Sequence, residues 1–133
     1  MCGIVGIVGS TQVTERLVDG LRRLEYRGYD SAGVAVITPQ GVLERRRAPG
    51  KIAGLDQAIA SAPTDGVIGI GHTRWATHGA PTLENAHPHA SGPVAIVHNG
   101  IIENFQDLRG ELKTEGFDCV TPTDSEVIAH LIA

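Results

Sequence analysis

Apolar residues recur with two different spacings along this chain, and the alternation predicts a domain that mixes strands with helices. Short apolar runs bounded by glycine, proline or polar clusters indicate strands, because such runs fit a pleated and partly buried surface. The long polar stretch at residues 73–92 predicts a loop between two strands that is either functional or mobile. The predicted strands lie at Cys2–Gly9, Ser31–Thr38, Val42–Arg47, Val67–His72, Val94–His98 and Phe117–Val120.

Spacings of three and four residues predict helices between these strands. In the first helix, the apolar residues within Val13–Leu24 share one face. Ser10 or Thr11 is expected to cap its N-terminus, because a hydroxyl can accept from the first free N–H groups. Gly28 is expected to end it in a left-handed turn.

Further helices are predicted over Ile52–Ala60, from Ile102 to an end at Gly116, and from a capping box formed by Thr123 and Glu126. The last helix reaches Ala133 without a C-cap, so we expect a piece of a longer protein. No apolar run approaches the roughly 18 residues of a membrane span.

Composition narrows the possible functions. The chain has 133 residues, which fits one domain, and 41% hydrophobic with 20% charged residues is ordinary for a globular protein. A formal net charge of -4 argues against a nucleic-acid partner, which usually meets a basic face. Only Cys2 and Cys119 carry thiols, so we predict no disulfide framework and a reducing cytoplasm.

Cys2 is the first candidate for chemistry, because an initiator methionine is trimmed when a small residue follows it. Trimming of Met1 would leave a free α-amine, with an ordinary pKa of about 8, beside the thiol. One residue would then supply both the nucleophile and the base that activates it. From position alone, the alternative that Cys2 is a packing residue of a buried strand stays open.

The segment 72–79 follows a predicted strand, where loops commonly place ligand-binding groups. The planar guanidinium of Arg74 matches a carboxylate. Trp75 would cover a pocket and exclude water, and Thr77 and His78 can hydrogen-bond a polar ligand. An ordinary exposed loop with one anchoring tryptophan is the alternative.

Asn99 and Gly100 follow another predicted strand and permit two interpretations. Asn-Gly is typical of a tight hairpin turn. Ile101 and Ile102, however, open a helical pattern, so the Asn99 amide and the Gly100 N–H could instead face a developing oxyanion.

Histidines gather between residues 72 and 98, but their spacing matches no closed zinc pattern, and no cysteine pair lies nearby. We therefore predict no metal and interpret them as loop or hydrogen-bonded residues. Cys119 lies on a predicted short strand and is interpreted as core packing.

Several motifs in one order resemble a known family. They are CGIVG from Cys2, LRRLEYRGYDSAG at Leu21–Gly33, HTRWATHG at His72–Gly79, NAHPH at Asn85–His89, VHNGIIEN at Val97–Asn104 and TDSEVIAHL at Thr123–Leu131. The chain resembles the glutaminase domain of the glutamine–fructose-6-phosphate aminotransferase family, whose members are N-terminal nucleophile hydrolases. The related amidophosphoribosyltransferase pattern resembles LQHRGQDAAG and TRYxTxG instead.

The resemblance implies a role for each matching residue. Cys2 would be the nucleophile, with its α-amine as general base, and Asn99 and Gly100 would form the oxyanion hole. Arg74 would grip the α-carboxylate of glutamine, and Asp124 would pair with its α-ammonium. The remaining implied residues are Thr77 and His78 as substrate contacts, Trp75 in the closing loop, and Arg27 and Gly28 packed beside the nucleophile.

The resemblance also implies an α+β fold, the four-layer αββα sandwich, present only as its N-terminal part. Residues 1–133 would be a glutamine amidotransferase type 2 domain truncated on its C-terminal side. It would hydrolyse L-glutamine to glutamate and ammonia through a Cys2 thioester, without cofactor, nucleic acid or membrane. Fructose 6-phosphate would bind only to further C-terminal domains, which convert it to glucosamine 6-phosphate in a full-length homo-oligomer.

Three alternatives compete with this hypothesis. The chain could be a non-catalytic glutamine-binding module that retains Arg74 and Asp124 but does not use Cys2. It could be an incompletely folded fragment. It could also belong to another class II amidotransferase, such as amidophosphoribosyltransferase.

Overall fold

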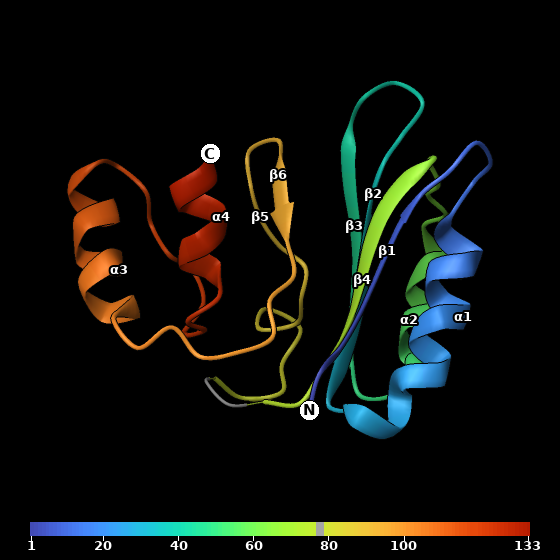
Figure 1. The fold of residues 1–133 in the computed structure, drawn as a ribbon, viewed down its shortest axis with the longest axis horizontal. Helices are drawn as coiled ribbons and strands as arrows, with labels where there is room; N and C mark the ends of the chain where they lie inside the picture. The colour runs from blue at the N-terminus through green and yellow to red at the C-terminus, as the bar shows by residue number, and fades with distance from the viewer. Residues whose placement is uncertain (77–78) are drawn as a thin grey trace.

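The computed structural model describes residues 1–76 and 79–133 and contains the strands and helices shown in Figure 1. No helix within these residues is both long and apolar enough to span a membrane. In chain order the elements are β1 (Gly3–Val8), α1 (Thr14–Leu24), the short 3-10 helix η1 (Glu25–Arg27), β2 (Ser31–Ile37), β3 (Leu43–Pro49), α2 (Ile52–Ser61), β4 (Ile68–Arg74), β5 (His89–Ser91), β6 (Val94–Ile96), α3 (Phe105–Thr114) and α4 (Glu126–Ile132).

A four-stranded antiparallel sheet with the strand order β1-β4-β2-β3 forms the centre of the fold. Helices α1 and α2 cover one face of this sheet, and the β5-β6 pair lies beside the other face (Figure 1). Helix α4 packs on β5 and β6, and α3 packs on α4. Helix, sheet, sheet and helix therefore form successive layers, which confirms the predicted αββα architecture.

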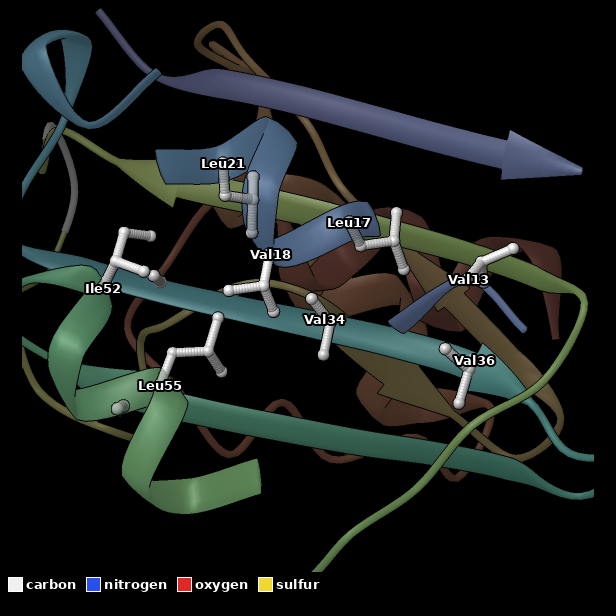
Figure 2. Close-up of a cluster of buried hydrophobic side chains, with 10 residues drawn as sticks. Val13, Leu17, Val18, Leu21, Val34, Val36, Ile52 and Leu55 are labelled. Carbon is white, nitrogen blue, oxygen red and sulfur yellow. The ribbon is translucent and has the colours of Figure 1, made fainter. Parts of the chain in front are cut away.

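The apolar core fills the space between the large sheet and its two helices (Figure 2). The helical spacing places Leu17 and Leu21 on the buried face of α1, and both are fully buried. Val34 and Val36 meet them from β2, where alternate residues face the same side of the sheet. Leu55 of α2 closes this core, so residues from three elements share one apolar layer.

The predicted N-cap of α1 is wrong. The helix begins after Val13, and no side chain within it or just before it caps it. Instead Asp65 Oδ1 accepts hydrogen bonds from the N–H groups of Val13 and Thr14, both at 3.0 Å, and from the Thr14 hydroxyl at 2.9 Å. A distant carboxylate thus satisfies the first free N–H groups, which local spacing does not reveal.

Gly28 ends the α1–η1 segment, but the predicted left-handed turn is wrong. Its φ of -171° is extended backbone that any residue can adopt. The glycine is needed for space, because a Cβ there would lie 2.8 Å from the carbonyl carbon of Arg74. Gly28 therefore lets the end of β4 approach this turn.

Two predictions near the C-terminus are also wrong. The residues 117–120 form no strand, and α4 begins only at Glu126, with no capping box to Thr123. The Glu126 carboxylate turns back instead and accepts from the N–H groups of Val120 at 2.9 Å and Thr121 at 2.8 Å. These bonds replace the ladder bonds of a strand and hold the segment as a loop.

The long polar stretch contains one short strand that the sequence pattern missed, β5, which pairs with β6. After β6 the chain runs as a loop through Asn99 and Gly100 to α3, which begins at Phe105 rather than at Ile102. No hairpin forms at Asn99-Gly100. The two residues lie in a loop, as the second interpretation of this motif requires.

Candidate active site

A cavity of about 480 Å³ opens where β1 begins and β4 ends. Segments that are far apart in the sequence meet there, because the antiparallel register of β1 and β4 places Gly3 opposite Thr73. The lining includes Cys2, Arg27, Arg74, Trp75, Asn99, Gly100 and Asp124. Seven of the predicted site residues are thus brought together at one cavity.

Cys2 is half-buried at the cavity wall, and its sulfur is oriented by the end of β4. The backbone N–H of Trp75 donates to Cys2 Sγ across 3.1 Å. The Gly3 N–H donates to Thr73 Oγ1 at 3.1 Å and fixes the start of β1. Met1, the residue that trimming would remove, is 79% exposed.

Asn99 lies directly across from Cys2 in the loop after β6. Its side-chain Nδ2 donates to the Cys2 carbonyl oxygen at 3.0 Å, and its Oδ1 lies 2.8 Å from His72 Nε2. Gly100 follows with φ +146°, a conformation that favours glycine. The Asn99 amide and the Gly100 backbone therefore border the same space as the sulfur.

Two buried and oppositely charged side chains line this cavity. Arg74 is 3% exposed, and its Nη1 and Nη2 donate to the carbonyls of Ala80 at 2.9 Å and Gly79 at 3.0 Å. Asp124 is 4% exposed, and its Oδ2 accepts from the Ile102 N–H at 2.8 Å. The cavity thus offers a cation and an anion to one bound molecule.

The supporting residues lie around the mouth of the cavity. Trp75 is 48% exposed and makes an edge-on contact with Tyr29, with ring centroids 5.5 Å apart. Arg27 is half-buried and donates to Met1 Sδ at 3.5 Å. The two predicted substrate contacts Thr77 and His78 lie outside the described residues.

Three histidines, interpreted from the sequence as loop or hydrogen-bonded residues, form a stacked group at the cavity, where His87 belongs to the lining. The rings of His72 and His87 stack with centroids 4.0 Å apart, and those of His87 and His89 meet at 4.5 Å. Burial lowers the pKa of His72 and of His89 to about 4, and it lowers that of His87 further. These rings are therefore neutral at pH 7. In the sequence, the separation of His87 and His89 by two residues was the only sign that these two rings could lie together.

One cluster of metal-ligand type exists among the described residues, but hydrogen bonds account for it. Ligand atoms of Cys119, Glu126 and His130 lie within 4.8 Å of one another. The Glu126 carboxylate already accepts from Val120 and Thr121 and contacts His130 Nε2 at 3.2 Å. Burial opposes ionisation of Glu126, yet these bonds lower its pKa, so it remains an anion that anchors the loop.

The fold and the cavity define a class of protein. A model of the glutamine amidotransferase domain family matches residues 51–133. The chain therefore belongs to this family and has the fold of its class II members, the N-terminal nucleophile hydrolases.

Within this class, curated relatives of high identity are aminotransferases. The chain is 63% identical over 133 residues to glutamine–fructose-6-phosphate aminotransferase (isomerizing) of Mesorhizobium japonicum and 62% identical to that of Rhizobium meliloti. All of this chain aligns, Cys2 included, but it spans only 22% of the length of these relatives.

Solved structures support the same fold. Glutamine phosphoribosylpyrophosphate amidotransferase from B. subtilis, complexed with ADP and GMP, matches with a TM-score of 0.78 and 28% identity. A second, described as the allosteric regulatory enzyme of purine biosynthesis, matches at 0.81 and 31%. Each covers 99% of this chain, which corresponds to 29% of the solved chain.

Proposed function

We propose that this chain carries the glutamine-hydrolysing site of an amidotransferase, which converts L-glutamine to glutamate and ammonia through a thioester on Cys2. The observation that supports this most directly is the single cavity that joins the Cys2 sulfur, the Asn99 amide and two buried opposite charges, Arg74 and Asp124. No cofactor is required by these groups.

The cavity suits a free amino acid. Its volume of about 480 Å³ lies within the usual range of small-molecule sites. Glutamine is a zwitterion, so the Arg74 guanidinium would bind its α-carboxylate and the Asp124 carboxylate its α-ammonium. Both side chains are buried, which strengthens such pairing relative to an exposed ion pair. Trp75 would help to enclose the ligand, and Thr77 and His78 stay predicted substrate contacts.

The chemistry follows from the N-terminal position of Cys2. After removal of Met1, the α-amine takes the thiol proton while sulfur attacks the amide carbon of the glutamine side chain. The resulting oxyanion would accept from Asn99 Nδ2 and from the Gly100 N–H. Collapse breaks the C–N bond, and the α-ammonium returns a proton to the leaving ammonia. Water then attacks the thioester, which yields glutamate and restores the thiol.

The full-length protein would deliver this ammonia to fructose 6-phosphate and form glucosamine 6-phosphate in domains outside this chain. Identity of 63% and 62% to glutamine–fructose-6-phosphate aminotransferases supports this choice over a phosphoribosyl acceptor, since the solved phosphoribosylpyrophosphate amidotransferase shares only 28%. The homo-oligomeric state and the cytoplasmic location stay predictions. Both thiols are free, which fits a reducing compartment.

Substitution of the two cysteines tests the proposal in the full-length protein. Cys2→Ala should reduce release of glutamate from glutamine by at least about 10⁴-fold, because the nucleophile is removed. Cys119→Ala is the matched control and should retain near-normal hydrolysis, since Cys119 lies outside the cavity. Undiminished hydrolysis by Cys2→Ala would refute the proposal.

Two further measurements separate the alternatives. A glutamine-like electrophile should label Cys2 in the processed protein and fail to label protein in which mass spectrometry finds Met1 retained. A purely glutamine-binding module would show glutamine binding by calorimetry without labelling or hydrolysis. An incompletely folded fragment would lack a cooperative unfolding transition.

A further inference from the structure

A buried imidazole lies directly behind the proposed oxyanion donor. His72 is fully buried in β4, and its Nε2 is 2.8 Å from Asn99 Oδ1. The other end of the same amide, Asn99 Nδ2, is 3.0 Å from the Cys2 carbonyl oxygen. His72 and Cys2 thus hold the Asn99 side chain from opposite ends.

These contacts determine where the protons are. A carbonyl oxygen only accepts, so Asn99 must direct its NH₂ group toward Cys2 and its oxygen toward His72. His72 Nε2 must then carry the ring proton and donate it to Asn99. The other nitrogen, Nδ1, is buried without a well-aligned hydrogen-bond partner among the described residues, although the His98 backbone interacts with the ring and partly offsets the lowering of its pKa by burial. That position suits an unprotonated nitrogen better than a stranded N–H.

The imidazole is well supported in this role. Its backbone belongs to β4, with Ile4 of β1 and Gly33 of β2 as paired neighbours, so it is fixed on the central part of the sheet. His87 stacks on its ring at 4.0 Å with planes 25° apart. An Asn99 amide without this donor could turn over and present its oxygen, which would repel a developing oxyanion.

We propose that His72 is a positioning residue for glutamine hydrolysis, whose Nε2–H holds the Asn99 amide with its NH₂ group toward the reacting carbonyl. The inference rests on the proposed glutaminase function. His72 itself touches neither glutamine nor the sulfur in this assignment and acts only through Asn99.

Two amide substitutions of different reach test the proposal in the full-length protein. A glutamine side chain can place an N–H near the position of Nε2, whereas asparagine reaches only the position of Nδ1. His72→Gln should therefore keep kcat within about tenfold, and His72→Asn should lower it about 10²- to 10³-fold, as for loss of an oxyanion donor. KM for glutamine should change little, since neither variant touches Arg74 or Asp124.

Two controls distinguish positioning from packing. Alkylation of Cys2 by iodoacetamide forms no carbonyl oxyanion, so its rate should be equal in both variants. In an Asn99→Ala background, His72→Asn should cause no further loss, because its partner is already absent. Equal losses in His72→Gln and His72→Asn, a loss confined to KM, or full additivity with Asn99→Ala would overturn the proposal.

A spectroscopic measurement on the unaltered protein does not depend on activity or on the folding of a variant. Nitrogen-15 NMR of His72 should show the tautomer with the proton on Nε2, and the tautomer with the proton on Nδ1 would overturn the proposal. If the unaltered, processed protein does not hydrolyse glutamine, the proposed function fails instead, whatever tautomer His72 adopts.

Discussion

The two halves of the chain bury different kinds of side chain. The large buried cluster runs from Val13 to Leu55 and is wholly apolar. Between residues 85 and 126 most of the buried side chains are polar or charged, including His87, His89 and Glu126. The first half therefore obtains stability from apolar burial, and the second half must satisfy each polar group individually.

This difference locates the site. Buried polar groups cost free energy unless they find partners, and several of those in the second half form a connected set. Both ring nitrogens of His87 are exceptions, since neither has a hydrogen-bond partner among the described residues. His89 contacts Thr123, and Glu126 holds the loop that carries Asp124 into the cavity. The apolar half acts as a platform for β1 and β4, while the polar half supplies the groups that face a charged ligand.

The largest expected difference between the two halves is the dependence of stability on pH, which we assign to the buried histidines. The unfolded chain protonates histidine near pH 6.5, whereas burial lowers the pKa of His72 and His89 in the fold to about 4. The unfolded state therefore binds more protons between these values, so stability is complete above pH 6.5 and is lost as pH falls toward 4. Each ring should cost about 2 kcal/mol between pH 7 and pH 5, or about 4 kcal/mol together, with His87 adding in the same direction.

Urea unfolding at pH 7, 6 and 5 measures this loss, and staying at or above pH 5 keeps the folded-state carboxylates of Glu126 and Asp65 ionised. His89→Gln removes one titrating ring and keeps an amide that can contact Thr123, so its stability should fall less between pH 7 and pH 5. Equal free energies of unfolding at the two pH values would contradict the role assigned to the buried rings.

The next effect concerns the apolar half. Leu17 is fully buried, and Leu17→Ala should lower the free energy of unfolding by about 3 kcal/mol through lost burial and an unfilled cavity. The loss should be the same at pH 7 and pH 5, because no titratable group is involved. Val8→Ala is the control: Val8 is 83% exposed, so its effect should stay within about 0.5 kcal/mol. A smaller loss of stability in Leu17→Ala than in Val8→Ala would contradict the view that apolar burial stabilises the first half.

The same contrast explains what could be predicted of the fold. The helical spacing of Val13, Leu17 and Leu21 and the apolar runs of the large sheet follow from burial on one face, so these elements were predicted within a few residues. The segment 117–120 also looked like a strand, but its N–H groups bond to Glu126 instead of a neighbouring strand. The Glu126 side chain therefore makes this segment a loop, and the local pattern of apolar residues does not reveal that contact.

For the site, the sequence motifs named Cys2, Arg74, Asn99 and Asp124, and the structure places all of them at one cavity. The orientation of the Asn99 side chain could not be predicted from the sequence, because it depends on His72, which lies 27 residues earlier. Hydrogen bonds between distant segments leave no periodic signal along a chain. The helix cap from Asp65 is another contact of this kind.

The smallest expected effect tests that cap, a polar contact that supports the first helix of the apolar half. Asp65→Ala removes the acceptor of the Val13 and Thr14 N–H groups and should cost about 1 to 2 kcal/mol at pH 7, as for loss of a helix cap. Burial favours the neutral acid, but hydrogen bonds from Thr14 and Gly66 lower the pKa of Asp65 below its ordinary value. Its contribution is therefore present above the unfolded value near 3.8 and is lost only as pH falls through the lower folded value.

Urea unfolding at pH 7 compares Asp65→Ala with Asp56→Ala, a matched acidic residue. Asp56 also contacts α1, through Arg22 at 3.1 Å, but the pair is exposed and should contribute less than about 1 kcal/mol. A larger loss in Asp56→Ala would mean that surface charge, rather than the distant cap, stabilises α1. A larger loss in Asp65→Ala, unchanged between pH 7 and pH 5, would show that this cap responds to pH differently from the buried histidines beside the cavity.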